Sequence, residues 1–122
     1  FRRVLFRSDI LSINDSDSID LTTLINNNTA YKGVTDIIDI TNTKANIMNI
    51  DMNDVIDLVD GDKQLVIKGD LEDKITLDTP SDWSNVGKEQ LDGVNYKVYT
   101  GTGVNSTIKL LIDDDIQVNH DI

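Results

Sequence analysis

The residues of this chain that are best suited to chemistry are aspartates, which gather in short segments that contain glycine. Every acidic residue except Glu72 and Glu89 is an aspartate, whereas an acidic helical surface would be built mainly from glutamate. Aspartate favours turns, and calcium binds about six to eight oxygen ligands that such turns can supply. The pattern therefore predicts calcium ligands at Asp60, Asp62, Asp70, Asp73, Asp113, Asp114 and Asp115.

These aspartates form three clusters that differ in how strongly they indicate calcium. The clusters around Gly61 and after Gly69 contain no EF-hand loop. The segment GDLEDKITLD is a degenerate form of the calcium-binding nonapeptide repeat, because it lacks that repeat's glycines. We favour residues 113–115, since three adjacent carboxylates repel one another unless a cation or solvent relieves them. Solvated turn carboxylates are the alternative for each cluster.

Aromatic residues offer a second kind of site. Trp83, Tyr96 and Tyr99 are the residue types that form platforms for sugars or peptides. The competing interpretation is that the rings fill the core, because an indole buries a large apolar area.

Catalysis has little support in the sequence. The chain has no cysteine, and its single histidine, His120, lies near the end, so a nucleophile paired with histidine is not indicated. Paired carboxylates can hydrolyse glycosides, but no pair of aspartates stands out. We therefore expect no enzymatic activity.

The charge of the chain restricts its partners. A net charge of −11 argues against nucleic acid and against an anionic membrane surface, which both attract clustered lysine and arginine. No apolar run approaches the ~20 residues of a membrane-spanning helix. We expect neither nucleic-acid binding nor membrane insertion.

The elements that would position these side chains are mostly strands. Alternation of apolar and polar residues predicts strands near 38–41, 48–52, 64–68, 74–78, 94–99, 106–112 and 116–118. Asp92-Gly93 predicts a type I′ hairpin that places Val94, Tyr96 and Val98 on one face and Asn95, Lys97 and Tyr99 on the other. Helical spacing predicts short helices at Ile19–Ile25 and Met52–Val59, capped by Asp17 or Ser18 and by Asp51 or Asn53.

Two strand–turn–strand units flank the second helix at equal spacing. Ile37 and Ile47 are ten residues apart, and so are Leu65 and Ile75. Two units do not establish a repeat. We expect a mainly β fold, a compact β-sandwich or β-roll with two short helices, and the alternative is a short β-solenoid.

The chain divides into three parts by composition. Residues 1–8 (FRRVLFRS) hold all the arginines and both phenylalanines, and they resemble the translation of a sequencing adapter. We expect them to be a non-native leader. Residues 9–33 form a polar lead-in with a short helix, and residues 34–122 form the β-rich part.

The order of motifs resembles a module of very large bacterial repeat adhesins of the RTX type. The likeness covers residues 34–118 and rests on DIIDITNT, the DVIDLVD helix, QLVIKGDLEDKITLD, the tryptophan, the LDGVNYKVYT hairpin and STIKLLIDDDIQV. In those adhesins the module commonly lies near the C-terminus, close to calcium-binding nonapeptide repeats and a type I secretion signal. This chain contains no intact nonapeptide repeat and no recognisable secretion signal.

The resemblance implies export through a type I system and folding outside the cell, where calcium is millimolar. Such adhesins hold bacteria to surfaces or to one another in biofilms. We therefore expect a non-catalytic structural module of a cell-surface adhesin, stabilised by Ca²⁺, that positions neighbouring domains of a longer chain. The alternative is a module of the same adhesin that binds a carbohydrate or a peptide, with a surface glycan or protein as partner.

Overall fold

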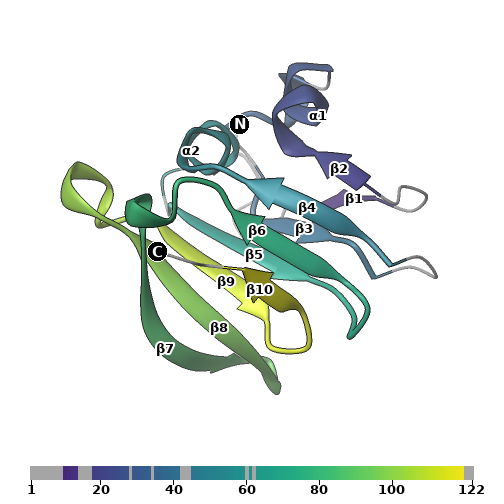
Figure 1. The fold of residues 1–122 in the computed structure, drawn as a ribbon. Helices are drawn as coiled ribbons and strands as arrows, with labels where there is room; N and C mark the ends of the chain where they lie inside the picture. The colour runs from purple at the N-terminus through teal and green to yellow at the C-terminus, as the bar shows by residue number, and fades with distance from the viewer. Residues whose placement is uncertain are drawn as a thin grey trace.

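The computed structural model describes residues 10–13, 18–27, 29–33, 35–41, 45–59, 61 and 63–119. They form two β-sheets that pack face to face, with two short helices at one end (Figure 1). The predicted leader, residues 1–8, lies outside this described part.

The larger sheet, sheet A, has the strand order β1-β3-β5-β9-β8-β7. Its first four strands run parallel to one another, and β8 and β7 continue the sheet in antiparallel pairing. The strands are β1 (Ile10–Ser12), β3 (Ile37–Asp39), β5 (Gln64–Lys68), β9 (Lys109–Asp113), β8 (Val94–Gly101) and β7 (Trp83–Leu91).

The smaller sheet, sheet B, is parallel throughout and has the order β10-β6-β4-β2. Its strands are β10 (Gln117–Asn119), β6 (Lys74–Leu77), β4 (Ile47–Ile50) and β2 (Ser18–Asp20). The chain therefore alternates between the sheets, and each pair of a sheet A strand and the following sheet B strand forms one rung.

Four rungs stack in sequence order, namely β1–β2, β3–β4, β5–β6 and β9–β10. In the third and fourth rungs a short turn joins the two strands, and the chain passes from one rung to the next through a helix or through the β7–β8 hairpin (Figure 1). The expected mainly β fold with two short helices is confirmed. Parallel pairing makes it a short β-roll, and the equally spaced units seen in the sequence are its second and third rungs.

The first rung comes from the segment that we described as a lead-in. β1 pairs with β3 and β2 pairs with β4, so this segment contributes a strand to each sheet. The helix α1 (Leu21–Asn27) buries Leu21 and Ile25 in the same core as the strands. Residues 10–13 and 18–27 therefore fold together with the rungs that follow.

The helices differ in how well the sequence located them. Asp51 caps α2 (Met52–Leu58) as expected, because its carboxylate accepts the backbone N–H of Asn53 at 2.7 Å. The prediction of a helix from Ile19 is wrong at its start, since that residue belongs to β2. The Asp20 carboxylate accepts the backbone N–H of Thr23 at 3.2 Å and thereby caps α1.

Short 3₁₀ turns complete the connections: η1 (Thr29–Tyr31), η2 (Pro80–Asp82) and η3 (Gly103–Asn105). At the hairpin, Asp92 and Gly93 have φ values of 53° and 83°, as a type I′ turn requires. This confirms the predicted hairpin. A bulge between Asn85 and Gly87 shifts the register of β7 against β8.

The core lies between the sheets and is built from alternate residues of each strand. Ile38, Ile67 and Ile112 from sheet A face Met48 and Ile75 from sheet B, and all five are fully buried. A second apolar cluster on the outer face of sheet A, which we call the outer cluster, contains Val66, Tyr96, Val98 and Leu111 with Ile37 beside them. Strands β5 and β9 are therefore buried on both faces.

We predict that Gly69→Ala destabilises the roll, because the turn after β5 has no room for a Cβ. The added atom would lie 2.6 Å from Ile116 Cδ1 and 2.9 Å from Asp73 Oδ2. Both neighbours are fully buried, so the expected loss of unfolding free energy is about 2 kcal/mol. Urea unfolding followed by Trp83 fluorescence measures it.

Gly61→Ala is the matched control, because no atom of the described residues lies within 4 Å of the Cβ position there. Equal urea midpoints for the two variants would contradict the packing of this turn.

Candidate functional site

Asp73, a predicted calcium ligand, is fully buried in the turn between β5 and β6. Its Oδ1 accepts the backbone N–H of Asn46 at 2.9 Å, and its Oδ2 accepts that of Asp70 at 2.7 Å. Its backbone carbonyl accepts the N–H of Gln117 at 3.1 Å. One residue therefore ties together the turns of three successive rungs.

These hydrogen bonds give Asp73, which we predicted as a calcium ligand, a structural role. Both carboxylate oxygens already accept main-chain N–H groups, as in a turn that is closed by an aspartate. Charge-assisted hydrogen bonds of this kind are roughly twice as strong as neutral ones. Asp73 thus acts as a structural acceptor that holds the register of neighbouring rungs.

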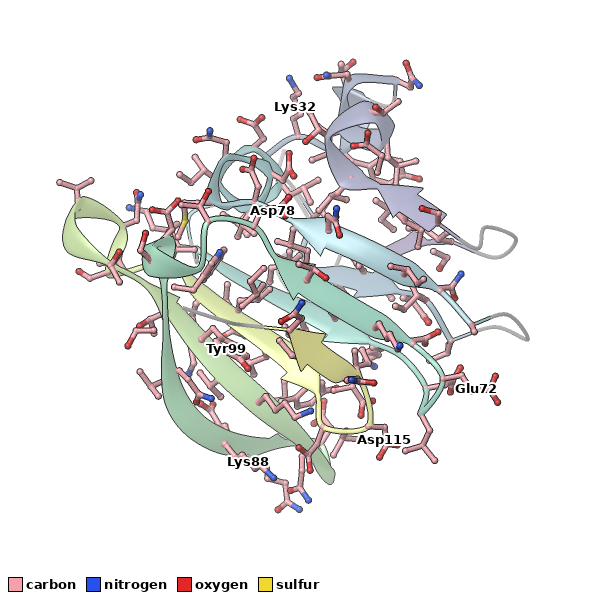
Figure 2. All side chains as sticks on the ribbon, in the orientation of Figure 1. Lys32, Glu72, Asp78, Lys88, Tyr99 and Asp115 are labelled. Atoms are coloured by element: carbon pink, nitrogen blue, oxygen red, sulfur yellow. The ribbon has the colours of Figure 1, made fainter. Side chains whose placement is uncertain are left out.

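The other described acidic candidates lie in the turns next to Asp73. Figure 2 shows Glu72 and Asp115 at this end of the roll, which we call the turn end, and Asp78 near the helices, at the helix end. Asp70 is half-buried in the same turn as Asp73. The acidic turns of two rungs therefore lie side by side.

Neighbouring groups relieve the repulsion among residues 113–115. Asp113 Oδ1 accepts the backbone N–H of Asp115 at 3.0 Å. Lys88 Nζ lies 3.2 Å from Asp114 Oδ1, with both side chains partly exposed. An exposed ion pair of this kind contributes about 0–1 kcal/mol. A lysine of β7 thus relieves part of the repulsion that we expected a cation or solvent to relieve.

Calcium ligation remains a prediction. Within the described ranges, no three His, Asp or Glu side chains come close enough together to hold a metal ion. Asp60 and Asp62 lie outside those ranges. The site residues that the structure does bring near one another are Asp70 and Asp73, and Asp113, Asp114 and Asp115.

The three aromatic candidates are all buried. Trp83 is 1% exposed and Tyr99 is 4% exposed, both in the core between the sheets. Tyr96 is 2% exposed in the outer cluster. Burial raises the pKa of both tyrosine hydroxyls. A platform for stacking needs open rings, so the structure places these three where they fill the cores instead.

A buried carboxylate that the sequence analysis missed joins the two helices. Asp54 of α2 is 5% exposed, and its Oδ1 accepts the hydroxyl of Thr22 on α1 at 2.7 Å. Burial raises the pKa of Asp54, the Thr22 hydrogen bond lowers it, and the charges of Asp51 and Asp20 raise it. The sequence did carry a signal for its burial, because Asp54 lies between Met52 and Val55, two apolar residues of the predicted helix face.

A groove lies between β10 and the hairpin, and sequence reasoning missed it as well. It has a volume of about 330 Å³ and is lined by Asn85, Gly87, Lys88, Lys97, Tyr99 and Val118. We call it the lysine groove. The sequence did place Lys97 and Tyr99 on one face of β8, but it could not tell which face looks toward sheet B.

Comparisons with known proteins do not assign the chain to a family. No protein-family model matches it, and no curated protein or solved structure gives a significant match. In the part of the chain that is described, neither α-helix is long and apolar enough to cross a membrane. The likeness to RTX-type adhesins therefore stays a prediction from the motifs alone.

We predict that Asp73→Asn lowers the free energy of unfolding by about 3 kcal/mol. The amide that replaces one carboxylate oxygen would point a donor at a main-chain N–H, which leaves that buried N–H unsatisfied. Denaturant unfolding of the two proteins measures the difference.

Asp115→Asn serves as control, since this exposed turn residue should change stability by less than about 0.5 kcal/mol. A loss of the same size in both variants would refute a special role of Asp73.

A second prediction concerns the pH dependence of stability. Because the pKa of Asp54 is raised in the folded state, the fold binds this proton more tightly than the unfolded chain does. The stabilisation is complete below the unfolded pKa and is lost as the pH rises through the folded pKa. Asp54→Asn should therefore raise stability at neutral pH and flatten this part of the profile.

Urea unfolding between about pH 4 and pH 7 tests this expectation. Asp57→Asn changes an exposed residue of the same helix and is the matched control. If Asp54→Asn left the slope of the profile as it is in the unchanged chain, the assignment would fail.

Proposed function

We propose that the chain is a non-catalytic structural module of a secreted, cell-surface adhesin, and that calcium stabilises its acidic turns. The module spaces or positions neighbouring domains of a longer chain. Export through a type I system and a place outside the cell belong to the same proposal. The order of motifs in residues 34–118 supports it, together with the fold.

The observation that carries the structural role is the continuous stack of rungs. Each rung adds one strand to each sheet in parallel register, and the apolar residues between the sheets are buried along the whole stack. A stack of this kind is held by many main-chain hydrogen bonds and has a defined length along the stacking direction. Both properties suit a spacer.

The observation that supports calcium is the distribution of charge. The chain carries a net charge of −11, and the acidic turns of successive rungs lie side by side at the turn end (Figure 2). Carboxylates held close together repel one another and oppose folding. A divalent cation between neighbouring turns would remove this repulsion. Calcium is available for this purpose outside the cell, where its concentration is millimolar.

We predict that millimolar CaCl₂ raises the thermal midpoint of the chain, and that EGTA reverses the rise. A cation that binds only the folded state at about 100 times its Kd stabilises that state by about 2.7 kcal/mol. Equal MgCl₂ should act less, because magnesium sheds its water reluctantly. Thermal unfolding followed by circular dichroism measures the three midpoints.

Matched variants locate the effect. Asp114→Asn should reduce the calcium-dependent rise, whereas Asp78→Asn removes one charge at the helix end and should not (Figure 2). Identical midpoints in calcium, magnesium and EGTA would refute calcium stabilisation. A rise that both variants retain would move the site away from the turn between β9 and β10.

A further inference from the structure

The two sheets of the roll do not end together. Within the described residues, sheet A continues beyond β9 with β8 and β7, whereas sheet B ends at β10. The inner face of the hairpin therefore faces a place where sheet B has no further strand. The lysine groove lies at this place, with Val118 of β10 on one side and side chains of β7 and β8 on the other.

The open edge of β10 faces the same groove. The N–H of Gln117 points toward β6, where it donates to the Asp73 carbonyl. Since successive residues of a strand point their main-chain groups to opposite sides, the N–H and carbonyl of Val118 face the groove. Among the described residues, none pairs with them. The neighbouring carbonyl on this edge, that of Ile116, accepts Lys97 Nζ at 2.6 Å.

The charges in the groove are unbalanced. Lys88 and Lys97 are directly opposite each other on β7 and β8, an arrangement that is destabilising for like charges. Asp114 pairs with Lys88, but within the described ranges no carboxylate reaches Lys97, whose partner is a neutral carbonyl. The net charge of −11 repels acidic groups at a distance, but this half-buried cation is complementary to an acidic group that enters the groove.

We propose that the lysine groove binds an extended acidic segment of another protein, which adds to β10 as a fifth strand of sheet B. Its main chain would bond to the N–H and carbonyl of Val118. Alternate side chains would enter the groove, where an apolar one packs beside the partly exposed Val118 and a carboxylate pairs with Lys97. The proposal does not depend on the adhesin assignment or on calcium.

The first test uses a fluorescent peptide of sequence TDTVTDT, whose Asp and Val side chains lie on one face when it is extended. Fluorescence polarisation against the whole chain at about 0.15 M salt, which screens the overall negative charge, should show saturable binding. Lys97→Gln should weaken this binding about tenfold or more, since one charged pair is lost. The control peptide TNTVTNT should bind the unchanged chain about as weakly as TDTVTDT binds Lys97→Gln. Lys97→Gln should weaken the binding of TNTVTNT little further.

The second test addresses the open edge. Val118→Pro removes the N–H that Val118 presents to the groove and leaves the bonds of Gln117 to β6 in place. This variant should weaken the peptide about tenfold or more, whereas Val118→Ala should weaken it less than about threefold. If Val118→Pro lowers the unfolding midpoint, a TDTVTDT peptide N-methylated at alternate residues decides, because it lacks the N–H that would donate to the Val118 carbonyl, the other main-chain bond at this edge.

Three results would overturn the proposal. One is the absence of saturable binding at millimolar peptide. Another is equal binding of the acidic and the neutral peptide to the unchanged chain and to Lys97→Gln. The third is concentration-dependent dimerisation that Lys97→Gln abolishes while the peptide does not bind, since a second copy of this chain would then be the occupant.

Discussion

The buried carboxylate of Asp73 sets a constraint on which the rest of the roll depends. Its two oxygens accept N–H groups from its own turn and from the turn of the previous rung. In a parallel sheet, a slip of one residue turns every side chain to the opposite face. By fixing how adjacent turns meet, Asp73 keeps Ile75 and Met48 side by side in the core and the polar residues of the same strands outside.

Local patterns in the sequence were enough to predict most elements, because alternation and turn chemistry act over a few residues. The strand at Gln64–Lys68 and the Asp92-Gly93 hairpin have the expected bounds. The start of α1 was missed because Ile19 fits both the helical spacing and a short strand. The pairing of the strands could not be predicted, since parallel partners are separated by an intervening helix or hairpin.

The roles of the candidate site residues were harder to predict, for a different reason. An aspartate that accepts main-chain N–H groups and one that binds calcium present the same oxygens, so composition alone could not separate the roles of Asp73. The sequence favoured a core position for Trp83 but left an exposed ring open, and the packing of β7 places it inside. Lys97 became notable because sheet B ends at β10, a property of the whole fold. Such features depend on contacts between distant parts of the chain.

The most direct test of this account is native-state hydrogen exchange of the amides of Asn46 and Asp70, the two donors to Asp73. If Asp73 holds the rungs in register, both amides should be protected as strongly as those of the central strands β5 and β6. Exchange of these two amides at the rate of exposed turns, with the strands still protected, would contradict the account.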